Sequence, residues 1–356
     1  MNSIDQAGVV QASLAAPEPT DEERAAAAAM LQLIGGLHIA RALYAVADLG
    51  IADGLAGGPM ATAKLARATG THEPTLYRVL RLLASVGVLR EQPPRTFGLT
   101  VLGDRLRTGV PASVRSWAML ADTIGLESFW PIIEMVRTGR PGVEISYGMK
   151  TFEHLHRDPE RAARFHATMS ERTAAFAPSV AAGYDFAGLG TVADIGGGQG
   201  ILLAAILRAH PHLHGILFDL PEVAASASRV LEAAGVWDRA EIVTGDFFQT
   251  VPAGADACLM ANVLHDWDDA QSVRILARCR QAMAPGGRVL IVERLIPDDP
   301  AAAVPVLISD LNMLIVTGGK ERTNAEYGEL LAAAGLSQGT ILPVGSPYGI
   351  IEGLAP

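Results

Sequence analysis

The spacing of apolar residues changes partway along the chain. In the first third, apolar positions recur every three or four residues, which predicts helices. Gly70 closes one of them, Pro74 lies in the first turn of the next, and Gly87 ends that helix. Two short extended runs follow at 88–90 and 96–99. Helix, turn, helix and hairpin together are typical of a winged helix.

From residue 188 onward, short apolar runs alternate with helices, which is the pattern of a parallel sheet. Seven runs are predicted to be strands: 191–195, 215–218, 240–243, 257–261, 288–292, 340–344 and 348–352. A capping-box sequence at Thr323 to Glu326 opens a helix that Gly335 closes. The chain is therefore predicted to be α/β, with a mainly helical domain before a mostly parallel seven-stranded sheet.

Four segments follow from these patterns. They are a flexible N-terminal tail at 1–23, a winged-helix-like domain at 24–110, a helical linker at 111–180 and the sheet domain at 181–356. Hydrophobic residues make up 49% of the 356 residues and charged residues 19%, which is too apolar for a disordered chain.

Charge decides how the winged helix is interpreted. The net charge of −10 argues against a protein that grips phosphate backbones, so we expect a dimerisation module and no nucleic-acid partner. The two cysteines, Cys258 and Cys279, lie far apart and fit a reducing cytoplasm. No signal peptide is recognisable, and the apolar run at 25–40 has 16 residues, short of the roughly 20 that span a bilayer. We expect no membrane association.

A glycine-rich turn, Gly196 to Gly200, follows the first predicted strand of the sheet. It reads G-x-G-x-G rather than the dinucleotide fingerprint GxGxxG, and by itself it is a weak signal for a nucleotide-like ligand. Acids at the ends of the next two strands strengthen it. Asp219 could accept hydrogen bonds from a ribose, and Asp246 with Phe247 could meet an adenine. Strand ends in such a sheet share one edge, so these groups point to one site.

Six motifs occur in a fixed order: 192–200, 218–221, 245–248, 265–269, 285–287 and 318–323. Together they resemble the S-adenosylmethionine-dependent small-molecule O-methyltransferases. These include plant caffeate and flavonoid enzymes and bacterial enzymes that tailor polyketides and other secondary metabolites. The resemblance covers about residues 30–356. It implies a Rossmann-like class I methyltransferase domain preceded by a winged-helix domain that forms a homodimer.

The resemblance also assigns residues. It implies that His265 is the general base and that Glu293 and Glu321 flank it. For cofactor contacts it implies Met169, Asp194, Gly196, Gly198, Asp219, Leu220, Asp246, Phe247 and Asn262. For the acceptor pocket it implies Trp130, Phe165, Trp267, Asn312 and Met313. Plant enzymes often carry a lysine where this chain has Ala261, which leaves Asn262 as a substitute on the adenine side.

Acid–base chemistry narrows the acceptor. Transferring a proton from a phenol, with a pKa of about 10, to an ordinary histidine at about 6.5 costs roughly 5 kcal/mol, and a neighbouring carboxylate would reduce that cost. An aliphatic alcohol, with a pKa near that of water at about 15.7, would cost far more. We therefore expect a phenolic or enolic acceptor, with S-adenosyl-L-homocysteine as the second product.

Other interpretations remain open. The sequence at 265–269 could bind a metal, and so could the histidines at 210–214; we expect no metal and a solvated loop at 210–214. Asp266 is expected to cap a helix and point away from His265. A relative with the same cofactor site could methylate nitrogen or carbon, decarboxylate or hydroxylate. A winged-helix regulator that senses a ligand is a further alternative.

Overall fold

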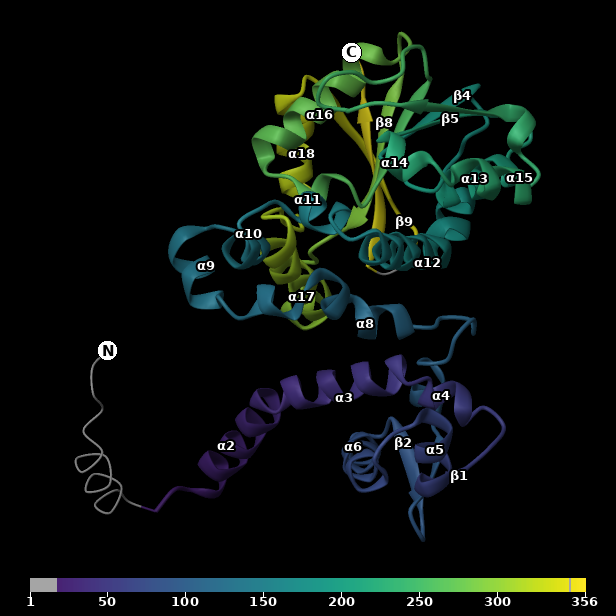
Figure 1. Ribbon diagram of the computed structural model, residues 1–356. Coiled ribbons are helices and arrows are strands. Elements are labelled where there is room, and N and C mark those ends of the chain that lie inside the picture. The colour runs from purple at the N-terminus through teal and green to yellow at the C-terminus, as the bar shows by residue number, and fades with distance from the viewer. Residues whose placement is uncertain (1–17, 346) are drawn as a thin grey trace. The chain divides into compact units, whose positions relative to one another are not determined.

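The computed structural model describes residues 18–345 and 347–356 (Figure 1). These belong to two compact units, one ending at Met119 and the other comprising Leu120–Pro356. Most of the predicted tail, residues 1–17, lies outside the described residues. Asp21–Glu23, predicted as tail, already form the first turn of a helix, because Thr20 caps it by accepting a hydrogen bond from the Glu23 amide at 3.2 Å.

The first unit contains the predicted helices and hairpin. Its elements are α2 (Asp21–Ile34), α3 (Gly36–Asp48), α4 (Ile51–Gly54), β1 (Met60–Ala61), α5 (Thr62–Thr69), α6 (Glu73–Ser85), β2 (Leu89–Gln92), β3 (Thr96–Leu99) and α7 (Val101–Asp104). The strands form a small antiparallel sheet in the order β1-β3-β2. Leu65, Leu80, Leu83 and Phe97 are fully buried between the helices and the sheet.

The stretch formed by α2 and α3 is longer than the sequence count suggested. Asp21–Asp48 is, by length and composition alone, long and apolar enough to cross a membrane, and only 6% of its most apolar window is buried. The expectation of a run too short to span was wrong because the count stopped before Arg41, whereas the helical stretch continues beyond it. The large apolar side chains exposed on it are Met30, Leu31, Leu33, Ile34 and Leu37.

The second unit contains a seven-stranded sheet in the order β6-β5-β4-β7-β8-β10-β9, in which only β10 runs antiparallel to its neighbours. The strands are β4 (Thr191–Ile195), β5 (His214–Asp219), β6 (Ala240–Thr244), β7 (Ala257–Ala261), β8 (Arg288–Arg294), β9 (Ser337–Pro343) and β10 (Tyr348–Leu354). All seven predicted strands are present, and the predicted fold class is confirmed.

Helices cover both faces of this sheet, as Figure 1 shows. Successive residues of each central strand face opposite sides, so Val192 packs under α13 (Ile201–Ala209) while Ala193 packs under α16 (Asp269–Ala282). The other helices of this unit that cover or flank the sheet are α12 (Pro159–Gly183), α14 (Pro221–Ala224), α15 (Ala227–Ala233), η2 (Trp237–Arg239) and α18 (Asn324–Ala333). Strands buried on both faces explain why they read as continuous apolar runs.

The remaining helices form a separate apolar cluster beside the sheet. They are α8 (Arg115–Ile124), which crosses from the first unit, η1 (Leu126–Phe129), α9 (Ile132–Thr138), α10 (Gly142–Tyr147), α11 (Thr151–His156) and α17 (Pro300–Val316). Ile124, Met135 and Val143 are buried in this cluster against Ile315 and Val316 of α17. The chain order places β4 at the centre, with β5 and β6 on one side and β7 and β8 on the other. The carboxyl ends of β4 and β7 are therefore the switch point at which such sheets bind ligands.

Candidate active site

A cavity of about 720 Å³ opens at these carboxyl ends. A volume of this size lies in the range that holds small molecules. Most of the predicted site residues line it: Phe165, Met169, Asp194, Gly196, Gly198, Asp219, Leu220, Asp246, Phe247, Asn262, His265, Trp267, Asn312 and Met313. Residues that come from more than a third of the chain's length are thus gathered around one space.

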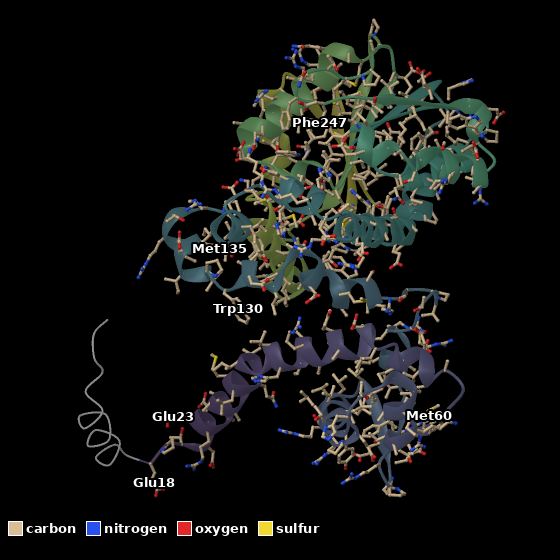
Figure 2. All side chains as sticks on the ribbon, in the orientation of Figure 1. Glu18, Glu23, Met60, Trp130, Met135 and Phe247 are labelled. Carbon is tan, nitrogen blue, oxygen red and sulfur yellow. The ribbon has the colours of Figure 1, made fainter. Side chains whose placement is uncertain are left out.

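Three predicted residues do not line the cavity. Trp130 is 58% exposed, and Figure 2 shows it at the outside of the second unit, so its assignment to the acceptor pocket was wrong for this structure. It lies directly after η1, where the chain turns outward before α9. Glu293 and Glu321 lie behind His265, where they contact the imidazole and not the open space.

The glycine turn between β4 and α13 leaves no room for side chains on its inner side. A Cβ at Gly197 would lie 2.4 Å from Leu217 and 2.7 Å from the Asp194 carboxylate. Gly198 has a φ of +59° and faces open space, and its amide donates a hydrogen bond to Asp219 at 2.8 Å. The turn therefore brings bare backbone to the cavity wall, where a ligand can approach closely.

Two acids lie beside this turn. Asp194 is 1% exposed, and its Oδ2 atom has no hydrogen-bond partner. Burial and the nearby charge of Asp219 raise the pKa of Asp194 to about 7. Burial also raises the pKa of Asp219, while amide hydrogen bonds from Gly198 and Leu220 oppose the rise. An orphaned buried carboxylate oxygen and a second acid at the cavity wall fit a ligand that brings amine or hydroxyl donors.

Aromatic rings form the wall at the end of β6. Phe247 and Phe248 both meet Trp267 edge-on, with ring centres 5.9 Å and 4.7 Å apart. Trp267, assigned to the acceptor pocket, thus packs against the ring predicted to meet adenine. Asp246 uses its carboxylate locally, since it accepts from the Phe248 amide at 2.8 Å and from Gln249 at 3.1 Å.

Asn262 closes the end of β7. It adopts a left-handed conformation with a φ of +53°, which asparagine tolerates better than most residues. Its Oδ1 accepts a hydrogen bond from the Tyr348 hydroxyl at 3.2 Å. Tyr348 was not predicted from the sequence, because β10 is distant from β7 along the chain.

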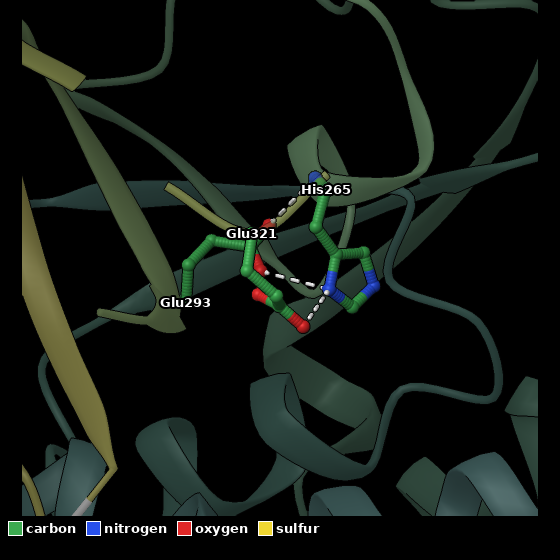
Figure 3. Close-up of side chains that lie close together, drawn as sticks. All are labelled: His265, Glu293 and Glu321. Atoms are coloured by element: carbon green, nitrogen blue, oxygen red, sulfur yellow. Dashed lines mark hydrogen bonds and ion pairs between the residues drawn. The ribbon is translucent and has the colours of Figure 1, made fainter. Parts of the chain in front are cut away.

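His265 is the most strongly held ionisable group of the cavity (Figure 3). It belongs to the short helix η3 (Leu264–Asp266) and is 4% exposed. Its Nδ1 atom lies 3.4 Å from Glu293 Oε2 and 3.3 Å from Glu321 Oε1, as the dashed lines in Figure 3 mark. A proton on Nδ1 held by two carboxylates leaves Nε2 as the proton acceptor.

Glu293 also holds the backbone of the turn that carries His265. Its Oε1 accepts amide hydrogen bonds from Val263 at 2.9 Å, Leu264 at 3.0 Å and His265 at 3.4 Å. One carboxylate at the end of β8 therefore positions both the main chain and the imidazole. Burial raises its pKa, which the positive charge of His265 opposes.

Asp266 differs from its expected position. Its Oδ1 atom lies 3.9 Å from His265 Nε2, so it faces the imidazole and does not point away. The cap of α16 is Asp268, which accepts from the Gln271 amide at 2.8 Å. The prediction failed because η3 is a tight 3₁₀ turn, in which adjacent side chains lie closer together than in an extended loop.

The pKa of His265 reflects these charges. Burial lowers it, but Glu293, then Asp266 and then Glu321 outweigh burial and raise it to about 9. Burial likewise acts to raise the pKa of Glu321, yet His265, Ser309 and Arg294 lower it overall. The Ser309 hydroxyl donates to Glu321 Oε1 at 2.7 Å, and Arg294 lies 3.5 Å away.

The donor atoms of His265, Glu293 and Glu321 lie within 4.8 Å of one another, a spacing that a metal ion could also use. Each carboxylate already accepts hydrogen bonds from the protein, so we interpret the three as an ion-pair cluster. The histidines of the 210–214 loop were expected to be solvated. The structure instead places His210 and His212 within 2.8 Å and 3.2 Å of the carbonyl oxygens of Ala181 and Phe186.

Arg322 was missed in the sequence. It is fully buried and donates to the carbonyl oxygens of Leu264 at 3.0 Å and Trp267 at 2.9 Å, on either side of the His265 turn. It also donates to Asp269 at 2.8 Å. The only available signal was its place in the loop motif at 318–323, where the adjacent Glu321 received all the attention.

The comparisons with known proteins agree with this site. An O-methyltransferase domain model matches residues 129–337, and an O-methyltransferase dimerisation domain model matches residues 31–109. The chain therefore belongs to the O-methyltransferase family and carries that family's dimerisation domain. It is a methyltransferase enzyme.

Individual relatives extend this finding. The chain is 41% identical to phenazine O-methyltransferase PhzM of Lysobacter antibioticus, over 91% of this chain and 94% of that protein. It is 40% identical to the 8-amino-8-demethylriboflavin N,N-dimethyltransferase of Streptomyces davaonensis, over 94% and 98%. The solved structure of NcsB1 from neocarzinostatin biosynthesis, in complex with S-adenosylmethionine and 2-hydroxy-5-methyl naphthoic acid, is 38% identical. It superposes with a TM-score of 0.78 over 89% of this chain and 96% of that one.

Arg322 provides the first test of this site. Arg322→Met should lower the free energy of unfolding by at least about 2 kcal/mol, because two buried carbonyl oxygens and Asp269 lose a charged donor. Urea titration followed by circular dichroism measures the change. Arg278→Met, an exposed substitution in α16, serves as the control and should stay within about 0.5 kcal/mol of wild type. Equal stability of the two variants would contradict the role assigned to Arg322.

Proposed function

We propose that this enzyme transfers a methyl group from S-adenosyl-L-methionine to a phenolic or enolic hydroxyl of a small secondary metabolite, with His265 as the general base. The observation that carries the proposal is the orientation of His265. Nδ1 faces two carboxylates, and Nε2 lies on the side of the cavity. That arrangement suits an imidazole that accepts a proton from a bound hydroxyl.

The cavity fits the cofactor that the family uses. When bound, S-adenosylmethionine supplies an electrophilic methyl group on its sulfonium sulfur, and S-adenosyl-L-homocysteine is the product. The backbone at Gly196 and Gly198 and the unpartnered oxygen of Asp194 would hold the methionyl part. Asp219 would accept from the ribose, and Phe247 would meet the adenine. Leu220, Asp246, Asn262 and Met169 line the same space.

The raised pKa of His265 makes proton transfer affordable. Against a phenol with a pKa of about 10, a base at about 9 faces an uphill transfer of only about 1.4 kcal/mol, compared with roughly 5 kcal/mol for an ordinary histidine. Asp266, Phe165, Met313 and Asn312 lie on the cavity wall, where they would contact the acceptor. An aromatic acceptor is also what the naphthoate-bound relative holds.

The closest alternative keeps the cofactor site and changes the atom that receives the methyl group. The relative from Streptomyces davaonensis is named for methylation at nitrogen, and carbon methylation, decarboxylation and hydroxylation use related folds. Methyl-labelled S-adenosylmethionine, incubated with matched phenols and anilines and followed by mass spectrometry, distinguishes transfer to oxygen from transfer to nitrogen.

We propose a homodimer formed through the first unit. Its dimerisation-domain match is consistent with the exposed apolar side chains of α2, which a second copy would cover. The same covering would explain the apolar stretch at 21–48 without a membrane. A cytoplasmic enzyme without a nucleic-acid partner fits the two free buried cysteines and the net charge of −10.

His265 is the residue to test first. His265→Ala should reduce kcat with a phenolic acceptor by about 10² to 10⁴, because the hydroxyl loses its proton acceptor. The Kd for S-adenosylmethionine, measured by calorimetry, should stay close to that of wild type. His214→Ala, at an exposed histidine, is the matched control. A variant that keeps wild-type kcat would contradict the assignment of the base.

The glycine turn is tested by adding a side chain. Gly198→Val should weaken binding of S-adenosylmethionine about tenfold or more, because the left-handed backbone resists a β-branched residue and the side chain enters the cavity. Gly235→Val is the control, since Gly235 has a φ of +70° with open space beside it and does not line the cavity. An unchanged Kd for the Gly198 variant would remove the turn from the cofactor site.

We also propose that the reaction needs no metal ion. Dialysis against EDTA should leave the initial rate of methyl transfer unchanged, because His265 and the carboxylates perform the proton transfer. The rate is measured with a phenolic acceptor before dialysis, after dialysis, and after adding Mg²⁺. Loss of activity that Mg²⁺ restores would contradict this proposal.

A further inference from the structure

Six charged side chains surround the point where the proposed base meets the cavity. His265, Glu293 and Glu321 form its centre, with Arg294 beside Glu321 at 3.5 Å and Asp266 beside Nε2 at 3.9 Å. Arg172 of α12 lines the same cavity and lies close enough to Asp266 to lower the pKa of that carboxyl. We call these six residues the charge cluster. His265, Glu293, Arg294 and Glu321 are each at most 6% exposed, so water screens their charges poorly.

Other ionisable groups near the cluster do not change its charge. Tyr327 of α18 is fully buried, and burial raises the pKa of its hydroxyl well above 10, which keeps it neutral. Asp310 of α17 accepts the Glu321 amide at 2.9 Å. Its charge is opposed by Lys320, which lies outside the cluster. Arg322 donates to backbone carbonyls and pairs with Asp269, so its charge is compensated there.

Within the charge cluster, the charges balance in only one protonation state. Three carboxylates face two guanidinium groups, so the sum is zero when His265 carries a second proton and −1 when it is neutral. A buried group of charges is more stable when it is balanced. The direction of the His265 pKa, upward despite burial, agrees with this count.

A protonated imidazole cannot act as a base, so the proton on Nε2 must leave before the reaction. The two forms of the cofactor differ in this respect, because the sulfonium is a cation and the thioether product is neutral. An acceptor oxygen within about 3 Å of both Nε2 and the methyl carbon places a sulfonium sulfur within roughly 8 Å of Nε2. At that distance a positive charge in the cavity can replace the charge of the imidazolium.

We propose that His265 releases its Nε2 proton to solvent when a sulfonium cation occupies the cavity, and keeps it when the uncharged thioether is bound. This inference rests on the proposed function and goes beyond it, because it links the state of the base to the state of the cofactor. The charge of the cavity is the same before and after the reaction. The imidazole regains a proton from the acceptor hydroxyl, and the sulfonium loses its charge with its methyl group.

The size of the effect can be predicted. Two unit charges roughly 8 Å apart, at an effective dielectric constant of about 20, shift a pKa by about 1.5. The pKa of His265 would then fall from about 9 to a value near neutrality plus one half. At pH 8.5, binding of the sulfonium form should release about 0.7 proton per site.

Calorimetry on the full chain measures this release directly. S-Adenosylmethionine and S-adenosylhomocysteine are each titrated at pH 8.5 in Tris and in HEPPS, whose ionisation enthalpies differ, and the difference in heat gives the protons released. We expect about 0.7 proton for the first ligand and close to none for the second. Equal release by both ligands would overturn the inference and leave the proposed function standing. Failure of either ligand to bind would overturn both.

Variants identify the group that loses the proton. His265→Gln should abolish the difference between the two ligands, and it also corrects for the α-amino group that both ligands share. Should this variant fail to fold, Asp266→Asn keeps the imidazole and removes one anion beside it. Because that change lowers the pKa of His265 before any ligand binds, the release at pH 8.5 should fall by at least half. An undiminished release in either folded variant would overturn the assignment to the charge cluster.

Discussion

The second unit depends on one carboxylate at the end of β8. Glu293 accepts hydrogen bonds from three successive backbone amides and contacts the imidazole of His265 with its other oxygen. A single side chain therefore joins the sheet to the turn after β7 and sets the rotation of the base. Arg322 holds the same turn from the opposite side through two carbonyl oxygens. Because the amides and carbonyls of η3 are occupied by side chains, the turn needs no regular secondary structure to hold its position.

The sheet supplies the second constraint. Its central strands are buried on both faces, so only their carboxyl ends are free to carry polar groups, and the switch between β4 and β7 leaves a space there. The glycine turn, Asp219 and His265 reach that space from strands that are not adjacent in sequence. The same geometry puts a cofactor edge and a base at one opening, which is what a transfer between two bound molecules requires.

Much of this arrangement could be predicted from the sequence because it is local. Strands appeared as short apolar runs, the α18 cap as a four-residue pattern, and the glycine turn as a break after a strand. Contacts between distant segments could not be predicted in this way. Arg322 looks like an ordinary surface cation until the fold brings Leu264 and Trp267 to it, and Tyr348 meets Asn262 only through the pairing of β10 with β8. Trp130 was misplaced for the same reason, since its exposure depends on how η1 leads into α9.

The cost of burying the charge cluster also bears on which atom receives the methyl group. Removing charged groups from water is unfavourable, and an apolar core of the same volume would often be as stable. An amine can attack a methyl group with its lone pair and lose its proton afterwards to water, so it needs no strong base in position beforehand. A phenol is a weak nucleophile until its proton has left, and a base whose pKa is raised to about 9 nearly matches its acidity. Aliphatic alcohols lie several orders of magnitude beyond that match. A cluster that raises the basicity of His265 is therefore useful for an acidic hydroxyl and superfluous for an amine, which favours oxygen over nitrogen as the acceptor atom.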